Sequence, residues 1–152
     1  DSEACNWARM RVHIVRNPLD VVVSLRTGSI MHIDSVVAGA NYWRESVATL
    51  ATLRKACRDR VLEFRYEDFM TDPAGHTARV LEFVGEPVEP GFMDAFVPQP
   101  RSYDHRTELT PRQIGIVRSI CGAHAKRYGY DLSGGAAQPR EGATPAAAAP
   151  DA

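Results

Sequence analysis

The sequence predicts an α/β fold in which a partial parallel sheet is flanked by helices, with more helix than strand. Two short apolar runs, at residues 12–15 and 61–64, are typical of buried strands. Residues 41–58 lie between them and repeat their apolar side chains at helical spacing, so this helical crossover should make the two strands parallel. Each further helix begins at a capping residue followed by proline. A chain of 152 residues is long enough for one domain with a hydrophobic core.

The composition argues against several classes of function. A general nucleic-acid or anionic-membrane binder carries a basic excess, whereas this chain has a formal net charge of −1, so any phosphate site must be local. The sequence contains no apolar run of about eighteen residues and no basic start followed by an apolar core, so we expect no membrane segment in this chain. Cys5, Cys57 and Cys121 show neither a metal-ligand spacing nor a disulfide framework. We expect them to be thiols, which favours reducing surroundings.

The first strand ends in a turn that combines several anion-binding features. Asn17 and Pro18 end the strand, because proline has no donor for the ladder, and they also serve as the cap and first position of a helix. Free N–H groups at a helix N-terminus attract anions, and Arg16 adds a planar fork of donors. Ser24 lies one turn after Asp20 on the same helical face. The pattern predicts an anion pocket; the alternative is that Arg16 pairs with a nearby carboxylate and Ser24 is an ordinary helix serine.

The second strand also ends in a cluster of polar residues. Arg65, Tyr66 and Glu67 follow it directly, and ligands in open parallel sheets bind at the carboxyl ends of the strands. The turns after both strands should therefore face one crevice. Glu67 and Asp68 are adjacent carboxylates of the kind used in acid–base catalysis. We expect instead that one of them caps or orients the turn after the second strand.

A third helix is predicted at residues 73–84, between the cap formed by Asp72 with Pro73 and the stop at Gly85. Four apolar residues of this helix should pack on the sheet: Val80, Leu81, Phe83 and Val84. After it, we expect a short helical piece near residues 92–96 and a polar, basic loop at residues 101–106.

The last helix is predicted to begin at Thr110 and Pro111 and to end before Gly129. Beyond it, residues 133–152 are rich in alanine, glycine and proline and contain almost no large apolar side chain. Such a segment buries too little to offset the entropy of ordering, so we expect a disordered tail. Among the histidines, His13 lies on the first strand, where we expect a core residue whose polar atoms are satisfied.

Several short motifs occur along the sequence in an order that is also found in a known protein family. They are Arg16-Asn17-Pro18-Leu19-Asp20 with Ser24, Phe64-Arg65-Tyr66-Glu67-Asp68-Phe69, Asp72-Pro73, Val80-Leu81-Glu82-Phe83-Val84-Gly85, and Tyr128-Gly129-Tyr130. In this order and spacing, over roughly residues 9–131, they resemble the sulfotransferases that use 3′-phosphoadenosine 5′-phosphosulfate (PAPS). The resemblance implies that the sheet is part of a P-loop-NTPase-like fold.

The resemblance also implies how a nucleotide is held. In that family a strand-end arginine and a serine at this spacing bind the 3′-phosphate, which implies Arg16 and Ser24, and a tyrosine near the adenine implies Tyr66. A basic loop late in the chain closes over the nucleotide in many members, which implies Arg101 and Arg106. The expected co-substrate is PAPS, with no metal. The expected acceptor is a hydroxyl or amine of a carbohydrate or small molecule, and not a nucleic acid.

One feature of the family is missing from this sequence. The family's Gly-rich loop carries a lysine that approaches the 5′-phosphosulfate, but neither Lys55 nor Lys126 lies in a Gly-rich strand-to-helix turn. We therefore expect residues 1–132 to be the C-terminal part of a sulfotransferase domain, with the donor loop, further strands and the catalytic base before residue 1. By itself, such a chain would bind the nucleotide weakly and would not turn over.

Two other interpretations stay open at this point. A P-loop nucleotide kinase or related NTPase would share the sheet, but would need a Walker lysine upstream and an acidic residue that binds magnesium. A non-catalytic nucleotide-binding module would bind nucleotide without activity even in a longer protein. The cysteine content favours the cytoplasm, and an anchor upstream of this chain would favour the Golgi lumen instead.

Overall fold

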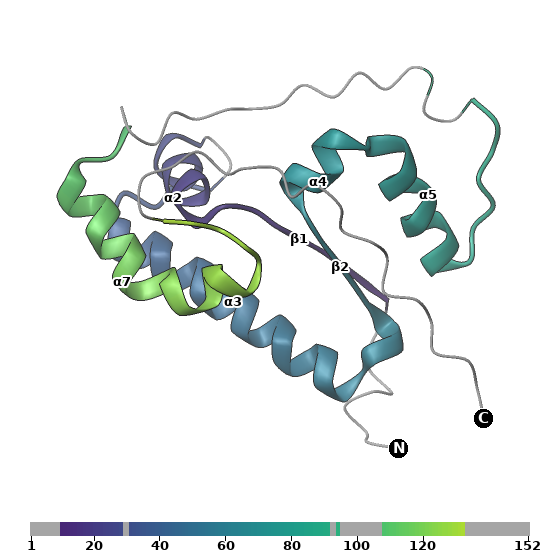
Figure 1. Ribbon diagram of the computed structural model, residues 1–152, viewed down its shortest axis with the longest axis horizontal. Coiled ribbons are helices and arrows are strands. Elements are labelled where there is room, and N and C mark those ends of the chain that lie inside the picture. The colour runs from purple at the N-terminus through teal and green to yellow at the C-terminus, as the bar shows by residue number, and fades with distance from the viewer. Residues whose placement is uncertain (1–9, 29–30, 92–93, 95–107, 133–152) are drawn as a thin grey trace.

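The computed structural model describes residues 10–28, 31–91, 94 and 108–132 (Figure 1). The elements in chain order are β1 (Arg11–Val15), α2 (Pro18–Thr27), α3 (Val36–Ala56), the 3₁₀ helix η1 (Arg58–Arg60), β2 (Val61–Arg65), α4 (Tyr66–Thr71), α5 (Pro73–Val84) and α7 (Pro111–Arg127). The predicted helical piece near residues 92–96 falls almost entirely outside this part of the chain. The predicted basic loop at residues 101–106 and the tail at residues 133–152 lie wholly outside it.

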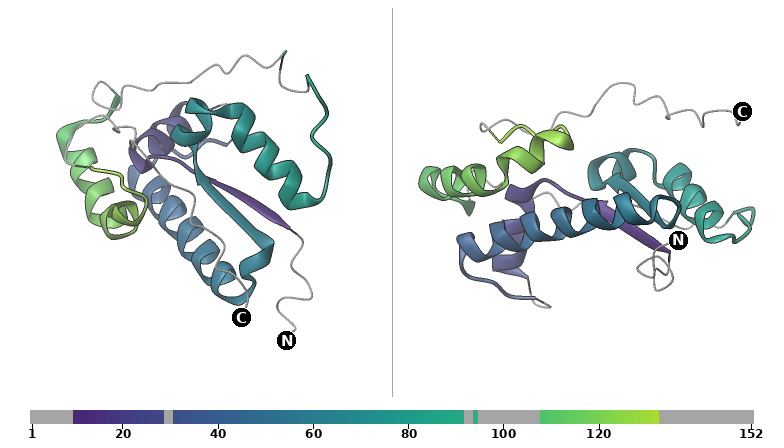
Figure 2. Two further views of the ribbon diagram at one scale, coloured as in Figure 1. Left: turned by 45° about the vertical axis from the view of Figure 1, so that its right-hand side comes forward. Right: turned by 90° about the horizontal axis from the view of Figure 1, so that it is seen from below.

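The two predicted strands pair with each other in parallel, as the helical crossover indicated. Arg11 lies opposite Val61 and Val15 lies opposite Arg65. Among the described residues the sheet consists of β1 and β2, with α3 and α7 on one side of the pair and α4 and α5 on the other (Figures 1 and 2). Because the strands run in the same direction, their carboxyl ends meet at one end of the sheet, where α2 and α4 begin.

The predicted helix caps are confirmed by their hydrogen bonds. Asn17 Oδ1 accepts from the backbone N–H of Leu19 at 2.9 Å, and Asp72 Oδ1 accepts from the backbone N–H of Gly75 at 2.9 Å. At its other end α5 stops at Gly85, whose φ of 80° lies in the left-handed region that favours glycine. Local chemistry therefore accounts for where these helices begin and end.

Two helices differ from what the sequence led us to expect. Helix α3 begins at Val36 instead of residue 41, because Ser35 Oγ accepts a hydrogen bond from the backbone N–H of Ala38 at 3.3 Å and caps an earlier start. The short helix α4 at Tyr66–Thr71 was not expected at all. Glu67 in its first turn complements the helix dipole, which helps a helix to start directly at the end of a strand.

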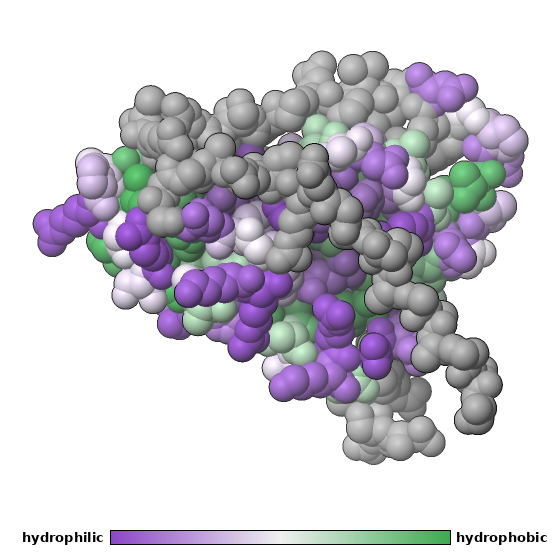
Figure 3. Space-filling model, viewed as in Figure 1, coloured by the Kyte–Doolittle hydropathy of each residue, from purple (hydrophilic) through white to green (hydrophobic). Residues whose placement is uncertain are grey.

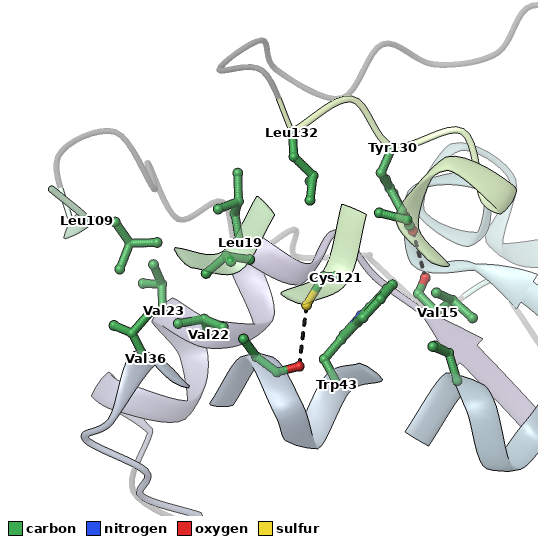
Figure 4. Packing of buried hydrophobic residues seen from close by; sticks show 14 residues of the cluster. Val15, Leu19, Val22, Val23, Val36, Trp43, Leu109, Cys121, Tyr130 and Leu132 are labelled. Carbon is green, nitrogen blue, oxygen red and sulfur yellow. Dashed lines mark hydrogen bonds between the residues drawn. The ribbon is translucent and has the colours of Figure 1, made fainter. Parts of the chain in front are cut away.

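The hydrophobic core lies where α2, α3 and α7 meet the end of β1 (Figure 4). Its members that are at most 2% exposed are Val15, Leu19, Val22, Val23, Ala40, Val47, Leu109, Val117, Cys121 and Ala125. Trp43 is also buried, as expected for a core residue. The Cys121 thiol donates a hydrogen bond to the backbone oxygen of Ala40 at 3.3 Å, and burial raises its pKa to about 12. Helix α7 is therefore anchored in the core through side chains that face α3.

Helix α5 does not join this core, which corrects the expectation that its apolar face packs on the sheet. None of its residues is buried, and Val84 is 39% exposed. It meets β2 through a cluster of rings: Phe64 stacks on Phe69 of α4 at 6.0 Å between ring centroids, and His76 of α5 lies 5.0 Å from Phe64. In the view of Figure 3 the surface is mostly hydrophilic, with smaller hydrophobic areas among the coloured residues.

The cysteines differ from the expectation that all are thiols. Cys57 is disulfide-bonded, whereas Cys121 is a free cysteine. Cys5 lies outside the described residues. The cysteine content therefore no longer favours reducing surroundings or the cytoplasm. Within residues 10–28, 31–91, 94 and 108–132, no helix has the length and apolar character needed to cross a membrane.

Candidate functional site

The turn between β1 and α2 is held in place from three directions. The indole N–H of Trp43 on α3 donates to the backbone oxygen of Arg16 at 2.9 Å. The backbone N–H of Asn17 donates to Glu67 Oε1 at 3.2 Å, which ties the turn to α4. Asn17 itself is 1% exposed and uses its side chain to cap α2. The backbone that carries Arg16 is therefore fixed before any ligand arrives.

These same hydrogen bonds use up much of the donor capacity of the helix N-terminus. Pro18 has no N–H, the N–H of Leu19 is taken by the Asn17 side chain, and the N–H of Asn17 is taken by Glu67. Sequence reasoning expected free backbone N–H groups to attract an anion here. An anion at this turn must instead be held mainly by side chains.

The Arg16 side chain lies between the two strand ends. Its guanidinium carbon is 4.5 Å from the centroid of the Tyr66 ring, which is close enough for a cation–π contact. Its Nη2 is 3.6 Å from Asp20 Oδ2, an ion pair that is too long for a good hydrogen bond. The carboxylate partner of the alternative interpretation is therefore present. An incoming anion would compete with Asp20 for a guanidinium that is already oriented by the Tyr66 ring.

The other predicted ligands of the nucleotide are placed less closely together. Ser24 lies on α2 one turn beyond Asp20, half-buried, and its hydroxyl makes no hydrogen bond to the rest of the described chain. Arg101 and Arg106 lie outside the described residues. The structure thus brings Arg16 and Tyr66 into contact, while the joint role of Arg16 and Ser24 stays a prediction.

Glu67 is the centre of a hydrogen-bond and ion-pair network next to this site, which was not predicted from the sequence. The Tyr130 hydroxyl is 2.7 Å from Glu67 Oε2 and 3.0 Å from the backbone oxygen of Val15. Arg65 Nε is 3.7 Å from Glu67 Oε2, and its guanidinium carbon is 4.7 Å from the centroid of the Tyr130 ring. Burial, and then the Glu67 carboxylate, raise the pKa of Tyr130, so the hydroxyl keeps its proton and acts as a donor.

Glu67 was expected to act on the turn after the second strand, but it acts on the turn after the first. It links Asn17 at the start of α2 to Tyr130 beyond the end of α7. The only sequence signal for this contact was the Tyr128-Gly129-Tyr130 stretch, whose role the motif series left undefined.

A second carboxylate, Glu63, lies in the middle of β2, opposite His13 in the middle of β1. It accepts hydrogen bonds from His13 at 2.9 Å, Tyr128 at 3.1 Å and Arg54 at 3.0 Å. Burial by itself would raise the pKa of Glu63, but the hydrogen bonds and the charges of its partners outweigh burial and lower it. Burial and the Glu63 charge raise the pKa of Tyr128 to about 12. His13 is thus satisfied by a partner, as predicted, but it is only half-buried and does not belong to the core.

A pocket of about 600 Å³ opens beside Arg16, between β1 and α3. Its lining combines apolar and aromatic residues, such as Val21, Tyr42 and Trp43, with polar ones, such as His13 and Glu45. No cluster of His, Cys, Asp or Glu that could hold a metal ion occurs in the described part of the chain.

Comparison with protein families agrees with this arrangement. The model of the sulfotransferase family matches residues 10–90, more than half of the 152 residues. The chain belongs to the sulfotransferase family. The matching region of this sulfotransferase-family chain runs from β1 through α5. It therefore contains the carboxyl ends of both strands, together with Arg16 and Tyr66. Helix α7 and Tyr130 lie beyond it.

Curated relatives are similar over a shorter stretch. Proteins named omega-hydroxy-beta-dihydromenaquinone-9 sulfotransferase, from Mycobacterium bovis and Mycobacterium tuberculosis, are each 35% identical over 80 residues. That stretch covers 47% of this sulfotransferase-family chain and 20% of the length of each relative. No solved structure matches the chain.

Proposed function

We propose that this chain contributes the 3′-phosphate and adenine side of a PAPS-dependent sulfotransferase. The observation that carries the proposal is the contact of the Arg16 guanidinium with the Tyr66 ring, at 4.5 Å, where the carboxyl ends of the two parallel strands meet. Arg16 supplies two donors in one plane for phosphate oxygens. Tyr66 offers an aromatic face beside the same place for adenine.

Ser24 completes the phosphate site in this proposal. Its hydroxyl makes no other hydrogen bond within the described residues, and it lies on the α2 face to which Asp20 already draws Arg16. Because the backbone N–H groups of Asn17 and Leu19 are already hydrogen-bonded, these two side chains carry the selectivity for a 3′-phosphate in this proposal. Arg101 and Arg106 remain proposed contributors from the chain between α5 and α7.

The reaction in this proposal is sulfuryl transfer from PAPS to a hydroxyl or amine of a carbohydrate or small molecule, within a P-loop-NTPase-like fold and without a metal. The name of these relatives refers to a hydroxy compound, which favours a hydroxyl acceptor. Such transfer depends on aligning donor and acceptor and on stabilising charge at the leaving phosphate. Arg16 would stabilise the bound nucleotide from its 3′ side.

The proposal is tested by comparing two nucleotides. Arg16→Ala is expected to weaken binding of adenosine 3′,5′-bisphosphate by about 1.5 to 3 kcal/mol, the loss of a hydrogen bond to a charged group, and to change binding of 5′-AMP much less. Isothermal titration calorimetry on the 152-residue chain measures both. Arg112→Ala, at an exposed position on α7, is the matched control. Equal losses for the two nucleotides would contradict the assignment of Arg16.

We also expect the 152-residue chain by itself to bind nucleotide without transferring sulfate. Lys55 lies in the last turn of α3 and Lys126 lies on α7, so neither occupies a Gly-rich turn where it would approach a 5′-phosphosulfate. Incubation with ³⁵S-labelled PAPS and a panel of hydroxyl acceptors measures transfer. Labelled product from the isolated chain would show that this chain holds a complete donor site.

A further inference from the structure

The two side chains proposed to hold the nucleotide lie on different elements. Arg16 belongs to the turn after β1, and Tyr66 begins α4 after β2. The last pair in the strand register is Val15 with Arg65, so both residues lie just beyond the paired part of the sheet. The contact of 4.5 Å between the Arg16 guanidinium and the Tyr66 ring therefore depends on what holds the turn and α4 together.

Hydrophobic packing does not account for the position of α4 relative to the turn. None of the six residues of α4 is buried, and the stacking of Phe69 on Phe64 attaches this helix to β2. On the other side, Trp43 attaches the turn to α3 through the backbone oxygen of Arg16. Neither contact fixes the turn relative to α4.

Glu67 joins the two elements directly. It follows Tyr66 on α4, and its Oε1 accepts from the backbone N–H of Asn17, the residue after Arg16, at 3.2 Å. Its Oε2 lies 2.7 Å from the hydroxyl of Tyr130, a buried residue of the core. One carboxylate thus links the neighbours of both proposed nucleotide-binding side chains and is itself held from the core.

The charge of Glu67 has a buried partner. The side chain of Arg65 is 8% exposed, its Nε lies 3.7 Å from Glu67 Oε2, and its guanidinium carbon lies 4.7 Å from the centroid of the Tyr130 ring. The Nε and Nη1 of Arg65 are buried without a hydrogen-bond partner in the described part of the chain, so its charge is balanced by Glu67 and the Tyr130 ring. The charge of Glu67 therefore stabilises the fold, whereas its two hydrogen bonds fix the turn to α4.

We propose that Glu67 is a positioning residue of the nucleotide site: its two hydrogen bonds hold the turn and α4 so that the Arg16 guanidinium lies over the Tyr66 ring before the nucleotide arrives. This inference rests on the proposed function for the identity of the ligand. Glu67 acts through Arg16 and Tyr66 and does not contact the nucleotide. Side chains that are already in place bind a ligand more tightly, because less conformational freedom is lost on binding.

Two substitutions of Glu67 separate position from charge. Glu67→Ala removes both hydrogen bonds and the charge. Glu67→Gln removes the charge but keeps an oxygen for the N–H of Asn17. Its amide N–H can donate to the Tyr130 hydroxyl, which then donates to the backbone oxygen of Val15, 3.0 Å away (Figure 4). Glu67→Gln should therefore lower the unfolding free energy but keep the turn in place.

The first measurement is NMR of the 152-residue chain without nucleotide. The ring current of Tyr66 should shift the side-chain protons of Arg16 upfield, because the guanidinium lies over the ring, and Tyr66→Leu identifies this shift by abolishing it. We expect Glu67→Ala to lose most of the shift and Glu67→Gln to keep it. Tyr130→Phe keeps the ring over Arg65 but lacks the hydroxyl, so it should reduce the shift and replaces Glu67→Ala if that variant does not fold.

The second measurement is the affinity for adenosine 3′,5′-bisphosphate by calorimetry, at a temperature at which every variant is folded. Glu67→Ala should weaken binding roughly tenfold, a usual size for coupling within one hydrogen-bond network. Glu67→Gln should stay within about threefold of the wild type. Val117→Ala is the control for stability alone, since it opens a cavity in the core on α7 and leaves the contacts of Glu67 in place, so the affinity should not change.

The two measurements together decide the proposal. An Arg16 shift that Glu67→Ala leaves intact, a loss of affinity no larger than that of Val117→Ala, or a loss in Glu67→Gln as large as that in Glu67→Ala would each overturn it. Absence of nucleotide binding by the wild-type chain would count only against the proposed function, because the Arg16 shift in the free protein still decides whether Glu67 positions this side chain.

Discussion

Single carboxylates decide how the functional residues of this chain are held. Glu67 connects the turn after β1 to Tyr130, and Asp20 forms an ion pair with Arg16 at 3.6 Å. Each of these carboxylates forms an ion pair with an arginine near a strand end, Asp20 with Arg16 and Glu67 with Arg65. The site is therefore organised without a ligand. An anion that enters it must compete with Asp20, which already forms an ion pair with Arg16.

Glu63 gives a pH-dependent contribution to folding stability whose sign follows from its lowered pKa. The unfolded chain binds a proton at this carboxyl before the folded chain does. The contribution is therefore complete above the ordinary glutamate pKa of about 4.3 and is lost as the pH falls through that value and then through the lower folded value. Glu63→Gln is expected to cost about 1 to 3 kcal/mol at pH 7.

Denaturant unfolding of both proteins between pH 7 and pH 3 measures this contribution. The difference in unfolding free energy between the two proteins should shrink toward low pH, because the wild-type carboxyl becomes protonated. Comparing the difference cancels the contributions of all other carboxyls. A difference that stays constant over this range would show that the charge of Glu63 does not contribute to stability.

At the scale of elements, capping chemistry explains where helices begin better than helix propensity does. Helix α7 has a reciprocal cap: Thr110 Oγ1 accepts from the backbone N–H of Gln113 at 3.3 Å, and Gln113 Oε1 accepts from the backbone N–H of Thr110 at 2.8 Å. This helix carries Val117, Cys121 and Ala125 into the core. Its first turn therefore matters to the packing of the whole chain.

Removing this cap is expected to destabilise the protein. Thr110→Ala should lower the unfolding free energy by about 1 kcal/mol, because it leaves an N–H at the start of α7 without its acceptor. Thermal and denaturant unfolding measure the loss. Thr52→Ala is the matched control: this hydroxyl lies on the exposed surface of α3 and donates to Ala48 at 3.1 Å, so the change should be neutral or slightly stabilising. Equal effects of the two substitutions would rule out a special role for the cap.

In the whole molecule, the hydrophobic core lies on the α3–α7 side of the strand pair and not on the α4–α5 side. It joins α2, α3, α7 and the end of β1, whereas α5 contains no buried residue and meets β2 through the rings of Phe64, Phe69 and His76. Stability within one chain varies with the number of buried apolar contacts. The α4–α5 side should therefore open more readily than the α3–α7 side.

Hydrogen exchange measures this difference. Under native conditions the amides in the middle of α5 are expected to exchange faster than those in the middle of α3 and α7, by roughly tenfold or more, since local opening of α5 exposes little buried surface. The amides of residues 117–121 are the internal reference, because Val117 and Cys121 are 0% exposed. Equal protection of α5 and α7 would show that the chain opens as one cooperative unit.

The sequence by itself determined the local structure and the family of this protein. Prolines and capping residues at Asn17, Asp72 and Thr110 act within a few residues, so their effects were predictable, as were two apolar strands joined by a helix. The motif series around Arg16 and Tyr66 likewise resides in short, contiguous stretches, and the family that it indicated is confirmed by the family match.

Only the tertiary structure decided which partners these residues meet. Tyr130 reaches Val15 across 115 positions and Glu67 reaches Asn17 across 50, and no local pattern marks such pairs. The same holds for the exposed placement of α5 and for the unsatisfied nitrogens of Arg65. Periodicity predicts which face of a helix is apolar. Whether that face is buried, and which hydrogen bonds its residues form, depends on the elements that pack against it, and these are known only from the tertiary structure.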